Sequence, residues 1–382
     1  MITGLIQPKK WKKYLAVGAA SLVAVVGTTC VVVRALPELP KELDATALVA
    51  AGLVLPNGAA EVLLHPEDTT SSQKSSSEDP VSLTEESSVV SEAASSESSS
   101  EAVSSDTDDT EKKPKKNWSG KAYPIQELTL QNGGVQYENV FVKNENDYTA
   151  IDIEEELQKQ PDLAIKRDGT PQVLLYHTHT MEAYLEEDTD TYYSDMDTRT
   201  KDSDRNVVAV GEVIAKRLEA AGIGVIHDKT IHDESYNGSY DRSADTIRKN
   251  LEKYPTIQVT IDIHRDSMTA EDGTRYRPTV EINGKKAAQI MIISGCNDDG
   301  TLNFPDWEYN LRLALQLQKA SAEVNSNFAR PLLFGPHIYN ENLTHNSLLV
   351  EFGTEVNTLD EALYSGELFG DVLAEVLART EA

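Results

Sequence analysis

The sequence is short of cysteine and of positive charge, and each shortage excludes a class of protein. Only two of its 382 residues are cysteines, and Cys30 lies inside an apolar run, so we expect no intramolecular disulfide. No histidine stands near Cys296 in sequence to activate its thiol, so nothing supports a thiol nucleophile. Lys and Arg number 35 against 63 Asp and Glu, giving a net charge of −28. Because phosphate would be repelled, the charge argues against a nucleic-acid partner.

Charge is absent from one stretch near the N-terminus, residues 14–33. A helix of about 20 apolar residues spans the ~30 Å hydrocarbon core of a membrane. The lysine-rich segment 1–13 precedes it, which favours a cytoplasmic basic tail and places the rest of the chain outside the cytoplasm. We therefore expect a retained single-pass anchor, with a cleaved signal peptide as the alternative.

Composition divides the remainder of the chain. Residues 34–65 form a mildly apolar juxtamembrane segment with no assignable role. Residues 66–117 are dominated by Ser, Glu, Asp and Thr, and they have too little to bury to offset the entropy of ordering, so we predict a disordered linker. Residues 118–382 have the pattern of a globular domain, which we predict to be an extracytoplasmic catalytic domain.

Strands and helices alternate along this domain, which predicts an α/β fold with a mostly parallel sheet flanked by helices. Apolar or alternating runs predict strands over 173–176, 224–227, 257–263, 289–294 and 347–352. Helical spacing predicts helices over 207–221, 243–253, 306–325 and 359–379, the first with Asp204 as a possible cap. In such sheets functional groups gather at the carboxyl ends of strands.

Three of the predicted strands end in residues suited to catalysis. His177 and His179 follow the first, and Glu182 lies on the loop beyond them. In 259–266, alternation puts Asp262 and His264 on one face and Val259, Ile261 and Ile263 on the other. Glu351 ends an apolar run that has no other reason to carry a charge.

These side chains would meet at one edge of a parallel sheet. Two histidines, a carboxylate and an open position make a catalytic zinc site. Zinc lowers the pKa of a bound water to about 7, and a nearby carboxylate can move the proton to a leaving amine. The pattern therefore predicts amide hydrolysis without a covalent intermediate.

At these positions the chain resembles the stage II sporulation protein P family of cell-wall hydrolases. The resemblance covers roughly residues 165–380 and the anchor-and-linker layout. It rests on the segments 176–182, 206–211, 232–233, 262–266, 349–353 and 357–359, of which His-Thr-His-Thr-x-Glu is the most diagnostic.

The resemblance implies a function, partners and a location. It implies cleavage of the N-acetylmuramoyl-L-alanine amide bond of peptidoglycan, with endopeptidase action on cross-links also credited to the family. It implies work beside stage II sporulation proteins D and M at the engulfment septum of the forespore, with Zn²⁺ as cofactor. The fold it implies is similar to that of the zinc N-acetylmuramoyl-L-alanine amidases.

Carried over by position, the resemblance also implies site residues. His264 matches a histidine ligand and Glu351 the catalytic glutamate. The other histidine ligand is His177 or His179, with His179 favoured because it stands farther past the strand.

The carboxylate ligand does not carry over directly. The general amidases place it just before the first long helix, where this chain has Asn206, a poor zinc ligand. Glu182 is the preferred substitute and Asp204 the second. Arg265 and Asp266 are expected either to contact substrate or to form a salt-bridged structural pair.

Two other functions share these features. A non-catalytic wall-binding scaffold of the engulfment complex would bind peptidoglycan without releasing product. A different metal-dependent hydrolase, such as a peptidase or deacetylase, would share the site and differ in substrate.

Overall fold

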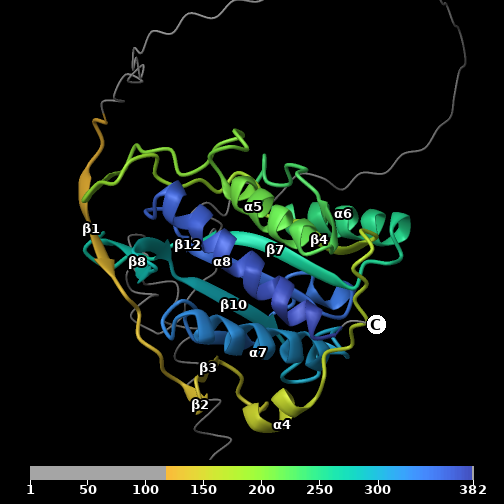
Figure 1. Ribbon diagram of the computed structural model, residues 1–382. Helices are drawn as coiled ribbons and strands as arrows, with labels where there is room; N and C mark the ends of the chain where they lie inside the picture. Colours follow the sequence, from red (N-terminus) through yellow and green to blue (C-terminus); the bar gives the residue numbers. More distant parts are fainter. Residues whose placement is uncertain (1–117, 381–382) are drawn as a thin grey trace, which may run out of the picture. The chain divides into compact units, whose positions relative to one another are not determined.

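An eight-stranded sheet forms the centre of residues 118–380, the part of the chain that the computed structural model describes (Figure 1). Five of its seven pairings are parallel, so the predicted mostly parallel sheet is confirmed. The two antiparallel pairings join β2 to β3 and β10 to β12. In spatial order the strands are β2 (Val135–Tyr137), β3 (Val140–Asn144), β11 (Leu332–Gly335), β10 (Ile290–Gly295), β12 (Ser347–Thr354), β7 (Val259–Asp266), β4 (Pro171–Tyr176) and β6 (Gly224–His227).

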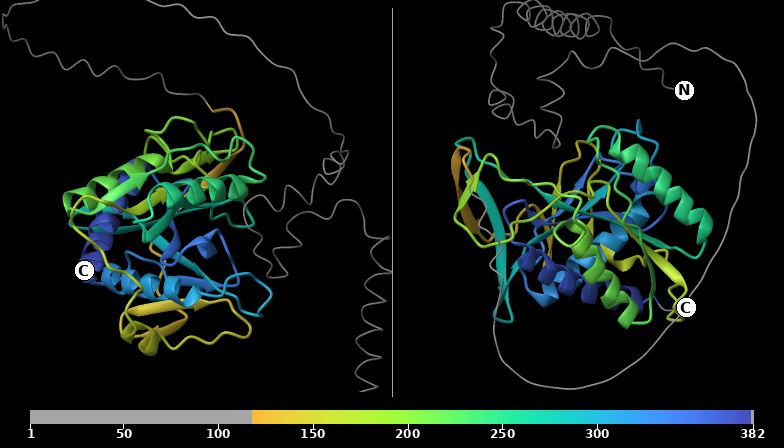
Figure 2. Two further views of the ribbon diagram at one scale, coloured as in Figure 1. Left: turned by 90° about the vertical axis from the view of Figure 1, so that its right-hand side faces the viewer. Right: turned by 90° about the horizontal axis from the view of Figure 1, so that it is seen from above.

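The two faces of this sheet are covered very differently. The helices are α4 (Ile153–Gln158), α5 (Val207–Ala220), α6 (Ser239–Lys253), α7 (Trp307–Val324) and α8 (Leu359–Ala378), with a 3₁₀ turn η3 (Glu341–Leu343). Helices α5, α7 and α8 pack on one face and bury the side chains of Val259, Ile261 and Ile263. Figure 2 shows α6 on the opposite side of the sheet from α5 and α8. There it buries Leu174 and Tyr176. The other face, which carries Asp262 and His264, is called the α6 face below.

Most predicted elements lie within one to four residues of their observed bounds, but one predicted helix cap and one predicted helix start were wrong. The cap of α5 is Asn206, whose Oδ1 accepts the N–H of Val208 at 2.9 Å, whereas Asp204 is exposed and caps nothing. Helix α6 begins at Ser239 rather than four residues later, because Gly238 takes a left-handed conformation (φ 76°) that starts it early.

A second, four-stranded sheet was not predicted. Its order is β5 (Thr191–Tyr193), β1 (Ala122–Leu128), β8 (Arg275–Ile282) and β9 (Lys285–Ala288). Strand β1 buries only Ile125 and includes Pro124, so it lacks the apolar alternation that identifies a strand in sequence.

The predicted anchor, 14–33, and the segments 1–13, 34–65 and 66–117 lie outside the described residues. None of the helices within 118–380 has the length and apolar character needed to cross a membrane.

Two glycines one helical turn apart bring α8 close to α5. A Cβ at Gly370 would lie 2.8 Å from Cβ of Arg217 and 3.3 Å from Cα of Ile214. A Cβ at Gly366 would lie 3.0 Å from Cγ1 of Val210. The two helices can therefore approach this closely only because neither glycine has a side chain.

We predict that Gly370→Val lowers the free energy of unfolding by about 1–3 kcal/mol, the usual cost of overpacking. Urea unfolding followed by circular dichroism measures the change. Glu375→Val places the same β-branched side chain at an exposed position of α8 and should cost below about 0.7 kcal/mol. Equal losses in the two variants would contradict the close packing.

Candidate active site

Three neighbouring parallel strands bring the predicted site residues together. Strand β7 lies between β4 and β12, with Tyr176 beside Asp262 and Glu351 beside His264 in the register. His179 follows β4 by three residues. The prediction that these strand ends meet is confirmed.

Two imidazoles from separate strands face one another at this place. The ring centres of His179 and His264 are 5.3 Å apart, and the ring planes are perpendicular at 88°. Two imidazoles that bind one Zn²⁺ at about 2.0–2.1 Å in tetrahedral geometry have ring centres about 5 Å apart. The spacing therefore suits a shared cation.

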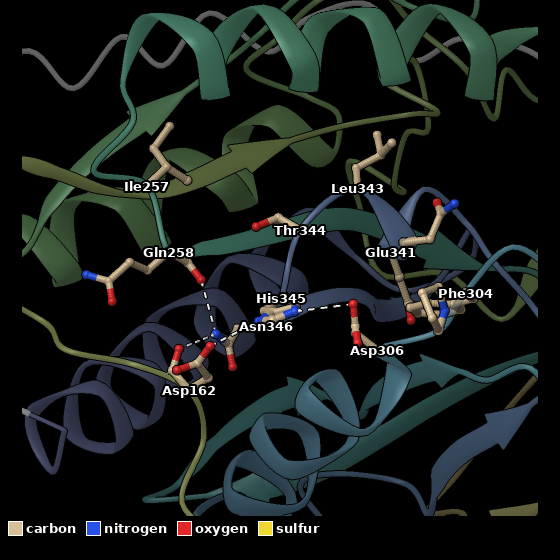
Figure 3. A pocket seen from close by; sticks show the side chains of 12 residues that line it. Asp162, Ile257, Gln258, Phe304, Asp306, Glu341, Leu343, Thr344, His345 and Asn346 are labelled. Carbon is tan, nitrogen blue, oxygen red and sulfur yellow. Dashed lines mark hydrogen bonds and ion pairs between the residues drawn. The ribbon is translucent and has the colours of Figure 1, made fainter.

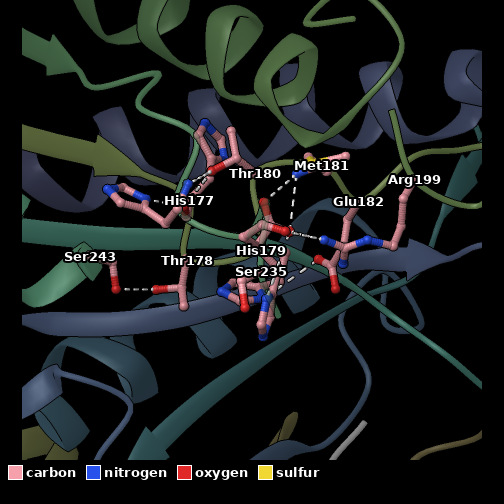
Figure 4. A network of polar contacts seen from close by, with 12 residues as sticks. His177, Thr178, His179, Thr180, Met181, Glu182, Arg199, Ser235 and Ser243 are labelled. Atoms are coloured by element: carbon pink, nitrogen blue, oxygen red, sulfur yellow. Dashed lines mark hydrogen bonds and ion pairs between the residues drawn. The ribbon is translucent and has the colours of Figure 1, made fainter. Parts of the chain in front are cut away.

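A buried aspartate lies beside one nitrogen of each ring. Nε2 of His264 is 2.9 Å from Oδ1 of Asp262, and Nδ1 of His179 is 3.8 Å from Oδ2 of Asp233. Both aspartates are fully buried. Figure 4 shows His179 beside Glu182 and Arg199, and Arg199 donates to Asp233 at 2.8 Å. Carboxylates placed in this way orient histidine ligands and leave the second ring nitrogen for the metal.

The carboxylate of Glu182 lies next to the second nitrogen of His264. Its Oε2 is 3.5 Å from Nδ1 of His264 and accepts the backbone N–H of Arg265 at 3.0 Å. A turn closed by the bond from the Glu182 N–H to the carbonyl of His179, at 3.1 Å, brings this carboxylate back to the site. Asp204 is exposed, so Glu182 is the better placed of the two predicted alternatives.

Glu351 supplies a second carboxylate on the same face. Its Oε2 is buried and has no hydrogen-bond partner within the described residues. Burial, together with the charge of Asp266, raises the pKa of Glu351 to about 8. A carboxyl group in this state is suited to proton transfer near neutral pH.

The site holds more acceptors than donors. Burial opposes charge on His264, but Asp262, Glu182 and Glu351 outweigh it and raise the pKa of His264 to about 10. Within residues 118–380, no three His, Cys, Asp or Glu side chains stand as a ready-made metal-ligand set. Because Asp262 lies beside Nε2 of His264 and Asp233 beside Nδ1 of His179, the nitrogens left for a metal are Nδ1 of His264 and Nε2 of His179, and Oε2 of Glu182 lies 3.5 Å from the first of these. This donor set fits a divalent cation after small side-chain rotations.

His177 has a structural environment instead. Its Nδ1 lies 3.1 Å from the carbonyl of Ile263, and its Nε2 lies 2.9 Å from Nε2 of His227. Both nitrogens are therefore engaged within the protein. The pair fits because residue 211 is glycine, where a Cβ would lie 2.5 Å from Nε2 of His227.

Arg265 and Asp266 do not pair with each other through their side chains. The guanidinium of Arg265 is buried and donates to the carbonyls of Ala183, Thr198 and Asp266. Asp266 instead accepts from Arg330 at 2.9 Å. Of the two predicted alternatives, the salt-bridged pair does not form, because the arginine fixes the loop after Glu182. Contact of these residues with substrate stays a prediction.

Sequence reasoning did not assign roles to Asp233, Asp262 or Thr178. Asp262 is the partner of His264 and accepts two hydrogen bonds from Thr178, at 2.8 Å from its N–H and 2.6 Å from its hydroxyl. Strand alternation already placed Asp262 on the face of His264, which was the available signal. Asp233 is some fifty residues from His179, and no local pattern links the two.

A cavity of about 500 Å³ lies away from this site (Figure 3). It is lined by residues that directly precede β7 and β12, including Gln258 and Asn346, and so lies at the other ends of these strands. Within it, His345 lies between Asp162 and Asp306, with nitrogen–oxygen distances of 3.0 and 3.7 Å.

The buried pair His177–His227 predicts acid sensitivity. Burial, and then the charge of the other histidine or of Lys229, lowers the pKa of His177 to about 3 and that of His227 to about 4. Both values lie below the ~6.5 of an unfolded histidine, so the unfolded state binds more protons as pH falls. The stability is therefore fully present above about pH 6.5 and is lost as pH falls, down to about 4 for His227 and about 3 for His177, by up to about 1.4 kcal/mol per pH unit for each histidine.

We predict that His227→Gln makes the thermal midpoint less dependent on pH between 6.5 and 4. The amide can still donate to His177 but does not titrate. Melting curves at several pH values measure the slope, and an unchanged slope would show that His227 titrates alike in the folded and unfolded states.

Comparisons with known proteins agree with the resemblance. A sequence model of the family Stage II sporulation protein P (SpoIIP) matches residues 59–374. Stage II sporulation protein P of Bacillus subtilis (strain 168) is 29% identical over 281 residues, and the match spans 65% of this chain and 65% of that protein.

Two solved structures are similar at a low level. The N-acetylmuramoyl-L-alanine amidase AmiC2 of Nostoc punctiforme matches with a TM-score of 0.34 and 12% identity, over 56% of this chain and 97% of that one. The CwlD amidase from Clostridioides difficile, in complex with the GerS lipoprotein, matches with a TM-score of 0.32 and 14% identity, over 54% and 94%. At these scores we draw no conclusion from either structure. Because the family model covers well over half of the sequence, the chain belongs to the stage II sporulation protein P family.

Proposed function

We propose that this protein is a zinc-dependent peptidoglycan hydrolase that cleaves the amide between N-acetylmuramic acid and L-alanine. One observation carries the proposal: His179 and His264 come from different strands, their ring centres are 5.3 Å apart, and Glu351 lies beside His264 in the register. Membership of a sporulation family supports the wall as the substrate. Cleavage of peptide cross-links would use the same groups.

His179, Glu182 and His264 would hold Zn²⁺, which when bound supplies a Lewis acid and a water with a pKa near ~7. Asp233 and Asp262 orient the two imidazoles from behind.

Glu351 is the group that moves the proton. Its buried Oε2 accepts a proton from the attacking water and returns it to the departing amide nitrogen. The peptide then leaves as an amine and the glycan as a free carboxylate.

A wall-binding scaffold without activity is the second candidate function. Burial of an unpartnered carboxyl oxygen at Glu351 costs stability, and a scaffold would gain nothing from it. This observation favours the enzyme. The proposal also includes a membrane anchor at residues 14–33 and a catalytic domain outside the cytoplasm. The protein would work with stage II sporulation proteins D and M.

If the proposed roles are right, variants of Glu351 and of His264 lose activity for different reasons. We predict that Glu351→Gln lowers kcat by about 10²- to 10⁴-fold with metal content unchanged, because only proton transfer is lost. His264→Ala should lose both metal and activity. Purified peptidoglycan is digested with the full chain, with and without chelator, and products are read by mass spectrometry alongside metal analysis.

The products distinguish the candidate functions. Stem peptides freed from glycan indicate an amidase, while monomers released from cross-linked dimers indicate an endopeptidase. Wall binding without products, indifferent to chelator, would establish the scaffold. Near-normal turnover by Glu351→Gln would remove this residue from the mechanism.

A second prediction concerns the carboxylate ligand. Glu182→Gln should lower zinc affinity and activity together, because its Oε2 lies beside Nδ1 of His264. Asp204→Asn is the matched control on the exposed loop and should change neither quantity. Competition with a chromogenic chelator measures affinity, and the reverse pattern would assign the ligand to Asp204.

A further inference from the structure

A row of aromatic rings leads away from the candidate site across the α6 face. The ring centre of His179 lies 5.7 Å from that of Tyr240, Tyr240 lies 5.5 Å from Tyr339, and Tyr339 lies 5.2 Å from His337. We call these four residues the ring row. Tyr240, Tyr339 and His337 are partly exposed, so the row offers ring surface to a ligand.

Two glycines leave the surface of the sheet free of side chains beneath His337, at the far end of the ring row. Gly295 of β10 and Gly335 of β11 are neighbours in the register. A Cβ at Gly295 would lie 2.1 Å from the carbonyl oxygen of His337, and a Cβ at Gly335 would lie 3.1 Å from its Nε2. The loop after β11 can therefore lie directly on the sheet.

The backbone that presents Tyr339 is strained. Tyr339 has φ 41° and Asn340 has φ 62°, left-handed values that non-glycine residues adopt at a cost of order 1–3 kcal/mol. The side-chain amide of Asn340 holds this turn by donating to the carbonyl of Tyr240 at 2.8 Å and to Oγ of Ser243 at 3.0 Å. The two tyrosines are thus fixed relative to each other.

The hydrogen bonds that hold Asn340 extend to the residues of the candidate active site. Oγ of Ser243 lies 2.7 Å from Oγ1 of Thr178, which donates to Asp262 at 2.6 Å. Asp262 in turn lies 2.9 Å from Nε2 of His264. A chain of short contacts therefore fixes the position of the ring row relative to His264, the proposed metal ligand.

We propose that the ring row binds the glycan strand of the substrate by stacking its sugar rings on Tyr240, Tyr339 and His337. This inference rests on the proposed function, since it places the cleaved amide at the end of the row beside His264. The C–H faces of an N-acetylhexosamine pack on aromatic faces, while its hydroxyls point outward to water.

Charge around the row selects among the parts of the substrate. Phenol side chains are neutral at physiological pH, and Glu145 lies 4.0 Å from His337. An acidic group would be repelled by Glu145 at this far end of the row, whereas an uncharged sugar would not.

Binding is tested apart from catalysis. The probes are β-1,4-linked N-acetylglucosamine hexasaccharide and glycan strands stripped of peptide, titrated calorimetrically into the full chain. Tyr339→Ala should weaken binding about tenfold through the lost ring contact, while Tyr339→Phe keeps wild-type affinity. With intact peptidoglycan, Tyr339→Ala should raise KM and leave kcat within about twofold, a split that general loss of structure would not give.

A matched pair on the opposite end of the strands provides the control. Tyr309 stacks on His345 at 4.2 Å and 13°, far along the sheet from the site. Tyr309→Ala removes an equivalent tyrosine–histidine stack and should bind the glycan probes as wild type does. Melting curves verify that both variants are folded.

The outcomes separate the two proposals. Glycan binding that depends on Tyr339, in a protein that releases no products, keeps the ring row and overturns the hydrolase. Hydrolysis with wild-type glycan binding by Tyr339→Ala overturns the ring row and keeps the hydrolase. Loss of affinity for free stem peptide, rather than for glycan, also overturns it.

Discussion

The fully buried carboxylate of Asp262 is the constraint on which the rest of the site depends. A buried charge is costly unless its lone pairs are satisfied, and Asp262 meets this requirement with two hydrogen bonds from Thr178 and the nearby Nε2 of His264. These contacts cross from β4 to β7, and Ser243 extends them to α6. Removal of any one partner would leave the others unsatisfied, so the geometry around His264 is fixed by the same interactions that stabilise this part of the fold.

The excess of carboxylates around His264 lowers the stability of the folded chain but suits the proposed binding of a cation. Burial raises the pKa of Glu182 and of Glu351, which means that the folded chain holds these groups at a cost. A divalent cation would offset that cost, because it supplies the positive charge that the donor set lacks. Metal binding and folding would then be coupled, as in other sites built from buried ligands. The buried, unpartnered oxygen of Glu351 is what a residue reserved for proton transfer requires.

Much of the large sheet could be predicted from sequence, because fully buried strands and amphipathic helices leave strong periodic signals. That Asp262 and His264 share one face of the sheet follows from alternation alone. The small sheet could not be predicted, since β1 buries a single residue and β9 begins with two exposed lysines. The residues alone leave the choice between His177 and His179 open, and the resemblance favours His179. The contact of His177 with His227 arises only through the β4–β6 pairing, which no local pattern encodes. Asp233 likewise contacts Met181 and Arg199 through tertiary structure, and no sequence spacing encodes that.

The antiparallel pairing of β10 with β12 explains why the loop after β11 lies on the α6 face. Because β10 and β11 run against β12, the loop after β11 emerges at the end of the sheet where β12 begins. To reach η3 and enter β12, this loop turns back over the glycine pair Gly295–Gly335 and lies on the α6 face. Helix α6 packs over β4 but leaves the strands toward β11 to this loop. The direction of β10 and β11, which sequence patterns do not encode, therefore places Tyr339 and His337 on the α6 face, where the proposed glycan strand would lie.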